Sequence, residues 1–362
     1  MDQESLKSAI QMVEKFSERE LAARALELDQ YPSKGFPKEL LDQAREIGLL
    51  SFLLSEEKGG IGGTPEQLAL LLEAIAQREA GFAGLILAHN LVCYFLLQAQ
   101  KEIPSEKILL TFPAYLDPEN LEEAALKSEQ AGKGRIKVSG KIRNVISAGI
   151  ADRVLIPVLE PEGISWFFLE LTQAGVKKEN LPLTLGLRTA LHANLTLEKT
   201  ELAEAGRIGK AGSGKELLQS AYFRFYPAAS AILIGLMAGS ARSAIKYGLE
   251  RYQGGEMIAD YEQIRFYYGQ MLAGYYALKA SLEKICQEDS ADEFTRVSLK
   301  AIAGNTAVQA AMDGVQMLGG YGYMHDYGQE KRMRDAGQAE KLLGAGRWLV
   351  VSLAENFIKR LG

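Results

Sequence analysis

The chain has 362 residues, of which 47% are apolar and 24% are charged, and 41 basic against 46 acidic side chains give a formal net charge of −5. This balance is typical of globular proteins with two or three domains, and its mild acidity argues against a nucleic-acid binder, which needs a strongly basic face. With only two cysteines and three histidines, we expect neither a disulfide framework nor a metal site.

The N-terminal segment, MDQESLKSAI, is polar and acidic and lacks the apolar core of a secretory signal. The apolar stretch from Ala228 to Ala241 has 14 residues, which is too short to span a bilayer. It therefore predicts a buried helix. We expect a cytoplasmic protein that does not bind membranes.

Residues 1–105 predict a helical domain, because apolar residues recur in them with helical spacing. The segment Thr-Pro-Glu-Gln at 64–67 combines an N-cap residue, a proline at the first helical position and a glutamine three residues after the cap. It predicts a helix that runs on to Ala80. The glycine-rich run 59–63 before it predicts a loop.

Residues 106–212 predict a small antiparallel β domain, because short β-branched and aromatic runs alternate with Gly, Pro and polar residues. Asp117 followed by Pro118 is typical of a helix start, so we expect an acidic helix over 118–128. The predicted strands cover 135–138, 153–159, 164–171 and 194–197.

Residues 213–362 are helical in pattern again and predict an antiparallel four-helix bundle, since long helices are joined by short connections. The whole chain is therefore expected to be α+β and mainly α. The predicted helices of this part cover 215–251, 261–287, 294–318 and 339–360.

Five segments carry motifs in a fixed order. They are P-K-E-L-L to L-L-E-A-I-A (37–79), G-K-I-R-N-V-I-S-A-G-I-A-D (140–152), L-G-L-R (185–188), Y-G-L-E-R-Y-Q-G-G-E-M-I-A-D-Y (247–261) and Q-M-L-G-G-Y-G-Y to R-M-R-D (316–335). Each motif alone is weak, but in this order and spacing they resemble the acyl-CoA dehydrogenase family along nearly the whole chain.

The resemblance implies the family's fold, with an N-terminal helical domain, a middle antiparallel β domain and a C-terminal four-helix bundle. It also implies FAD held at a subunit interface, an acyl-CoA substrate oxidised at its Cα–Cβ bond, and electron-transfer flavoprotein as a partner. The chemistry needs a positioned carboxylate base, donors for the thioester carbonyl and a firmly held flavin ring.

The sequence departs from the family where the catalytic base is expected. Counted from Arg334-Asp335, the base position falls on Leu343, and the position that some members use instead falls on Phe225. Neither side chain can accept a proton. Glu340 lies one helical turn before Leu343 and is a candidate for a displaced base. The competing interpretation is a solvated carboxylate beside Lys341.

The positions that hold the flavin within one subunit are also altered. Thr111 is retained as a flavin-edge residue, but Phe112 stands at the family's glutamate and Tyr115 occupies the turn of small residues. Asn144 and Ile146 stand where the family has a stacking tryptophan and a threonine that bonds near the flavin N5 atom. We therefore expect FAD to be weakly held by the lone chain, or absent from it.

The positions that serve the FAD of a neighbouring subunit are better retained, although Gly254 and Glu262 stand where the family has phenylalanine and glutamine. The resemblance assigns pyrophosphate contact to Arg251, and contact with the adenosine end to Gln316, Gly319 and Gly320. A guanidinium fork suits a pyrophosphate, and glycine lets the backbone approach a dinucleotide closely. The competing interpretations are a surface ion pair with a nearby glutamate for Arg251, an interhelical hydrogen bond for Gln316 and a plain helix cap for the glycines.

These retained and lost positions predict a base-lacking subunit of a heteromeric acyl-CoA dehydrogenase, in which a homologous subunit supplies the base and the flavin cradle. Two alternatives stay open at this point. One is an active homo-oligomer that uses Glu340, and the other is a flavin-free protein that binds acyl-CoA or acts as a scaffold.

Overall fold

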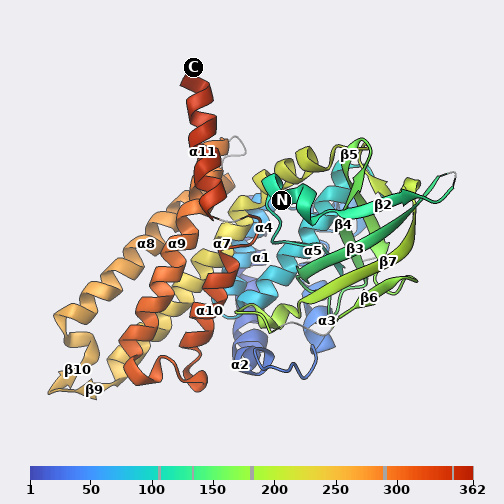
Figure 1. The fold of residues 1–362 in the computed structure, drawn as a ribbon. Helices are drawn as coiled ribbons and strands as arrows, with labels where there is room; N and C mark the ends of the chain where they lie inside the picture. The colour runs from blue at the N-terminus through green and yellow to red at the C-terminus, as the bar shows by residue number, and fades with distance from the viewer. Residues whose placement is uncertain (105–106, 133, 180–182, 288–291, 345, 362) are drawn as a thin grey trace.

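The computed structural model describes residues 1–104, 107–132, 134–179, 183–287, 292–344 and 346–361. It has the predicted α+β order, with N-terminal helices, a middle sheet and C-terminal helices (Figure 1). The sheet forms one side of the molecule, and the long C-terminal helices form the other.

The N-terminal helices include the predicted helix start at Thr64. The side chain of Thr64 accepts a hydrogen bond from the Gln67 amide while the Gln67 side chain accepts one from the Thr64 amide, so the capping box is confirmed. The helix ends at Ala76, however, and the next one begins at Ala80. The helices are α1 (Gln3–Phe16), α2 (Ala25–Leu28), α3 (Lys38–Glu46), α4 (Pro65–Ala76) and α5 (Ala80–Gln98).

The middle sheet has eight strands in the order β6-β7-β3-β2-β4-β5-β8, with β1 beside β4. The prediction of an antiparallel domain needs correction, because β1 and β2 both pair with β4 in parallel. The predicted helix over 118–128 is also wrong: its helical part ends at Ala124, and the residues after it pair with β3. The strands are β1 (Leu110–Thr111), β2 (Leu126–Gln130), β3 (Arg135–Val145), β4 (Arg153–Glu160), β5 (Gly163–Glu170), β6 (Val176–Lys178), β7 (Ala193–Ala203) and β8 (Arg207–Ile208).

The C-terminal part contains three long helices close to their predicted bounds, whereas the helix predicted over 339–360 begins only at Gly346, because a turn separates it from a shorter helix that ends at Ala339. Leu343 and Gly344 between them have φ values of 60° and 104°, which a helix cannot contain. The helices are α7 (Gly214–Glu250), α8 (Glu262–Gln287), α9 (Glu293–Leu318), α10 (Gln329–Ala339) and α11 (Gly346–Leu361), and two short strands, β9 (Tyr252–Gln253) and β10 (Glu256–Met257), follow α7.

Two helices, α5 and α7, are long and apolar enough to cross a membrane by length and composition. Their most apolar windows are 89% and 78% buried inside the protein, as expected of core helices. The predicted buried helix over 228–241 is thus one part of α7, whose 37 residues exceed the apolar stretch seen in the sequence.

Buried polar contacts join the three parts. The Glu66 carboxylate on α4 bonds Arg224 on α7 at 3.0 Å and Arg296 on α9 at 2.6 Å. His89 on α5 bonds the carbonyl of Leu50 through Nε2 and accepts the Leu110 amide of β1 through Nδ1. Burial lowers the pKa of His89 to about 4, so the imidazole is neutral. Its two hydrogen bonds link α5 to Leu50 and to β1.

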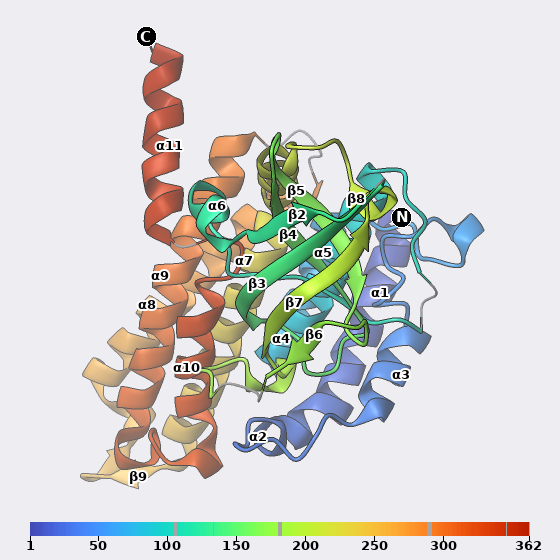
Figure 2. The same ribbon diagram turned by 45° about the vertical axis from the view of Figure 1, so that its right-hand side comes forward.

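Helix α11 extends away from the rest of the molecule in both views (Figures 1 and 2). Only Leu349 of its described residues is buried. Its far half contacts the beginning of α9, where Phe357 meets Phe294 edge-on and the Arg360 guanidinium lies 4.0 Å from the Phe294 ring centroid.

Candidate functional site

Four of the residues predicted to contact FAD lie along one open groove of about 730 Å³, which we call the Arg251 groove. Its walls come from the end of α7, the turn after β9, the beginning of α8 and the end of α9. The residues that line it are Tyr247, Arg251, Gln253, Gly254, Ile258, Tyr261, Gln263, Ile264, Gln316, Met317, Leu318, Gly319, Gly320, Tyr321 and Met324.

Arg251 directly follows the last residue of α7, and its backbone is fixed on both sides. Its amide donates to the Tyr247 carbonyl, and its carbonyl accepts from the Ile258 amide, each at 2.9 Å. The guanidinium lies 5.7 Å from the Tyr321 ring centroid, a cation–π distance. Within the described residues it has no carboxylate within 4.0 Å, so the surface ion pair considered from the sequence is not formed.

Gln316 and the two glycines form the opposite wall, at the end of α9. The Gln316 side chain is exposed and makes no hydrogen bond to any residue that the structure describes. Gly319 caps α9 with a φ of 55°, which explains the glycine at that position by the turn alone. A Cβ on Gly319 would meet nothing within 4 Å, so the backbone there is open to a ligand.

One departure from the family changes the shape of this groove. Gly254 stands where the family has phenylalanine, and its φ of 70° favours glycine. A Cβ at this position would lie 2.3 Å from the Tyr261 hydroxyl. That hydroxyl donates to the Gln253 carbonyl at 2.7 Å, so Tyr261 takes the room that a larger residue at 254 would need.

The structure also brings together the positions at which the resemblance places the flavin ring and the base. Residues 111–116, which we call the strap, run past both. The Thr111 hydroxyl donates to the Ile146 carbonyl, and the Leu343 amide donates to the Ala114 carbonyl at 2.8 Å. Motifs that are far apart in the sequence therefore lie next to each other in the fold. Thr111 and Leu343, however, lie outside the Arg251 groove. Ala345, the last position of the family's base segment, lies outside the described residues.

This second location is closed. Thr111, Phe112, Ile146, Phe225 and Leu343 are all 0% exposed, which means that a water-sized sphere cannot touch them. Phe112 packs edge-on against Tyr222, and Phe225 against Tyr94. The residues present do not fit an isoalloxazine ring, because these side chains are packed without open space among them.

Hydrogen bonds that no sequence pattern predicts hold the strap in place. The Tyr115 hydroxyl donates to His192 Nε2 at 2.8 Å and accepts from Gln338 Nε2 at 3.0 Å. Burial lowers the pKa of His192 to about 3, so the ring is neutral and its Nε2 can accept the hydrogen bond from Tyr115. The only signal in the sequence is a lone histidine within an apolar run, which does not indicate a partner.

Glu340, the candidate displaced base, lies at the end of α10. Its carboxylate pairs with Lys341 at 2.8 Å, and its backbone carbonyl accepts from the buried Lys300 ammonium, also at 2.8 Å. A Cβ on Gly304 of α9 would lie 2.7 Å from Glu340 Cγ. The side chain therefore lies against α9 and beside a lysine, and no described contact joins it to the strap.

The L-G-L-R and R-D motifs have a structural role, since they bind each other. Asp335 accepts the Leu187 amide at 2.6 Å, and Gln338 accepts the Gly186 amide at 2.9 Å. A Cβ on Gly186 would lie 2.4 Å from the Arg334 carbonyl, so glycine is required for α10 to approach this turn.

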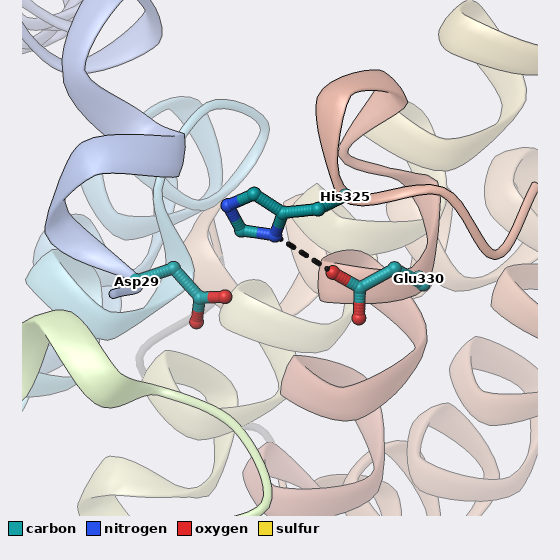
Figure 3. Close-up of side chains that lie close together, drawn as sticks. All are labelled: Asp29, His325 and Glu330. Atoms are coloured by element: carbon teal, nitrogen blue, oxygen red, sulfur yellow. Dashed lines mark hydrogen bonds and ion pairs between the residues drawn. The ribbon is translucent and has the colours of Figure 1, made fainter. Parts of the chain in front are cut away.

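A carboxylate and histidine group at Asp29, His325 and Glu330 has the spacing of metal ligands (Figure 3). The Arg334 guanidinium binds both carboxylates, with Nη1 3.2 Å from one Asp29 oxygen and Nη2 3.0 Å from one Glu330 oxygen. Although burial opposes the charge, the hydrogen bonds from Arg334 lower the pKa of Glu330. The group is an ion-pair network in which arginine takes the place that a cation would need.

Two family models match the chain. Residues 3–109 match the model described as acyl-CoA dehydrogenase, N-terminal domain, and residues 218–355 match the one described as acyl-CoA dehydrogenase, C-terminal domain. Together these matches span about two thirds of the chain.

Relatives and solved structures agree with these matches. The chain is 28% identical over 355 residues to cyclohex-1-ene-1-carbonyl-CoA dehydrogenase of Geobacter metallireducens, covering 92% of each chain. It is 27% identical over 350 residues to an acyl-CoA dehydrogenase of Bacillus subtilis, covering 90% of each. The structure of butyryl-CoA dehydrogenase from Megasphaera elsdenii superposes with a TM-score of 0.89 at 21% identity, covering 99% of this chain and 100% of that one.

Proposed function

Because the chain belongs to the acyl-CoA dehydrogenase family, we propose that it is the base-lacking subunit of a heteromeric enzyme that oxidises the Cα–Cβ bond of an acyl-CoA. A homologous subunit supplies the catalytic carboxylate and the flavin cradle. This chain supplies the Arg251 groove to that subunit's FAD. FAD held at this interface would supply the hydride acceptor for the oxidation, and electron-transfer flavoprotein would take up the electrons.

The main support for this proposal is the close packing around the strap, which leaves no open site there. Leu343 stands at the base position with its amide bonded to Ala114, and Phe112 of the same strap is fully buried. A ring bound there would have to displace several buried apolar side chains, at about 1.5–3 kcal/mol for each that becomes exposed. The chain's own site therefore opposes both flavin binding and proton abstraction.

The Arg251 groove supports the second half of the proposal. It is open, lined by aromatic rings and amides, and carries a guanidinium without a carboxylate partner among the described residues. Arg251 would hold the pyrophosphate of the partner's FAD, and Gln316 with the backbone at Gly319 and Gly320 would meet the adenosine end. Charge-assisted hydrogen bonds of this kind contribute about 1.5–3 kcal/mol.

The test compares the chain purified alone with the chain purified together with its homologous subunit. We expect the lone chain to be colourless and inactive towards acyl-CoA, and the mixed complex to retain flavin through gel filtration. In the complex, Arg251→Ala should weaken FAD affinity roughly tenfold to a hundredfold, and Arg251→Lys should restore it only in part. Arg265→Ala is the matched control, because Arg265 pairs with Asp260 on the surface near the groove and does not line it.

Two results would contradict the proposal. A yellow homo-oligomer that turns over an acyl-CoA, and loses that activity in Glu340→Gln, would establish the displaced base. Equal FAD affinity of the wild-type complex and its Arg251→Ala variant would remove the role in the partner's site and favour a flavin-free scaffold.

A further inference from the structure

A small cavity of about 180 Å³ lies beside the first half of α10. Its apolar walls come from the residue range before α2, α2 itself, the end of α4, the beginning of α5 and the middle of α7, and they are Ala22, Ala25, Leu26, Ala76, Ala80 and Leu236. The charged side chains that line it are Arg78, Lys331, Arg332 and Asp335. Neither the Arg251 groove nor the strap contributes to it.

Arg332 is the unusual member of this set. It lies on the same helical face as the buried Ala336 and Ala339, a place normally taken by an apolar residue. Its guanidinium makes one hydrogen bond, from Nη1 to the Gly328 carbonyl at 3.1 Å. Over the part of the chain that the structure describes, it has no other hydrogen-bond partner and no carboxylate within 4.0 Å. Burial lowers the pKa of Arg332 and the neighbouring Arg78 adds to that shift, although Asp335 and Glu79 oppose it.

The acidic groups near Arg332 are already engaged. Lys331 Nζ lies 2.8 Å from Glu79 and 2.6 Å from Asp335. The remaining oxygens of these carboxylates accept the amides of Gly81 at 2.9 Å and Leu187 at 2.6 Å. Each carboxylate thus bonds a lysine and a backbone amide, and neither can turn towards Arg332 without leaving one of them.

A second guanidinium and a helix end add positive potential to the same cavity. Among the residues that the structure describes, Arg78 pairs with Glu18, whose side chain is 60% exposed, so this surface pair is weak and readily exchanged. Gly328, at the beginning of α10, also lines the cavity, and no side chain caps that helix end. The helix dipole there favours an anion.

We propose that this cavity binds a small oxyanion, a phosphate or a carboxylate group, held by the Arg332 guanidinium with Arg78 at its mouth. A half-buried guanidinium keeps several donors in a planar fork, and an oxyanion satisfies two of them at once. One water requires roughly 10–15 Å³ of such space, so the cavity has room for the anion. This assignment is independent of the heteromer and of FAD.

Isothermal titration calorimetry of the full chain with sodium phosphate and, separately, with sodium acetate tests the proposal, using sodium chloride at matched ionic strength as reference. We expect saturable binding of at least one oxyanion. Binding of phosphate alone identifies a phosphate ligand, and binding of acetate alone identifies a carboxylate. Absence of saturable binding for both, or equal heats with chloride, overturns the site.

Variants assign the binding to the cavity. Arg332→Leu should weaken affinity tenfold or more, and Arg332→Lys should weaken it less, because an ammonium keeps the charge and loses the fork. Arg78→Gln provides a second test at a partly exposed position where folding is not at risk, and it should weaken affinity severalfold. Arg242→Leu is the matched control, since Arg242 lines a different groove. Unchanged affinity in both the Arg332 and the Arg78 variants overturns the proposal.

Discussion

Replacing Lys331 by methionine should cost this protein more than removing a typical lysine–glutamate pair. The ammonium lies between two buried carboxylates, Glu79 and Asp335, at 2.8 and 2.6 Å. Methionine fills much of the same volume but leaves both carboxylates without their cation. Breaking a buried pair from one side costs about 3–5 kcal/mol, so we expect a loss of unfolding free energy of that size at about pH 7.5.

The loss should shrink as the pH falls. Burial raises the pKa of Glu79 above its ordinary value of 4.5, and removal of the lysine strengthens that effect. A raised carboxyl pKa means that the folded state binds a proton more readily than the unfolded state, so the variant loses stability as the pH rises above 4.5 and regains it on acidification. We expect a smaller deficit at about pH 5 than at about pH 7.5.

Urea unfolding followed by circular dichroism measures both quantities. The matched control is Lys177→Met, because Lys177 pairs with Glu198 at the same 2.8 Å but both side chains are about 60% exposed. A surface pair contributes about 0–1 kcal/mol. The reasoning is refuted if Lys331→Met and Lys177→Met lose similar free energy, or if the deficit of Lys331→Met does not change with pH.

Three further predictions concern the helices and the buried histidines. Thr64→Ala removes the capping box and should lower the unfolding free energy by about 1 kcal/mol, seen as a lower thermal midpoint. Gly235→Ala should destabilise by about 1–3 kcal/mol because its Cβ would lie 2.4 Å from the Glu73 carbonyl, whereas Gly269→Ala, with nothing within 4 Å, should stabilise by about 0.5–1 kcal/mol. The same sign for both would contradict the packing argument. His89 and His192 have pKa values of about 4 and 3 and stay neutral in the folded protein, so its stability should fall as the pH drops below 6.5. Urea unfolding midpoints measure this loss. Protonation of either ring near pH 6.5 in NMR spectra would refute it.

Local signals in the sequence predicted those elements whose stability is local. The Thr64 capping box and the long apolar period of α7 need no distant partner, and both are present. The residues after Ala124 continue a helix-favouring composition, yet they form β2 because β3 and β4 offer backbone partners there. Tertiary pairing overrides propensity in such short segments.

The candidate site likewise contains residues that sequence motifs predicted and contacts that only the fold reveals. Arg251 and Gln316 could be named from motifs, but only the packing of α7 against α9 places them on one groove. The Tyr115–His192–Gln338 contacts join residues 77 and 223 positions apart, and no periodicity or spacing encodes such a meeting. Arg332 carried one usable signal, a charge on the face of α10 that its alanines mark as buried.

The Glu66 ion pairs set an order of events during synthesis of the chain. The partners of this α4 carboxylate, Arg224 and Arg296, follow it by 158 and 230 residues. At about 5–20 residues per second, translation of the longer interval takes roughly 10–45 s. Throughout that time α4 and the apolar α5 have left the ribosome without the helices that cover them. The nascent chain therefore exposes a long apolar segment to which chaperones can bind. Codon usage between α5 and α9 should then affect the yield of folded protein.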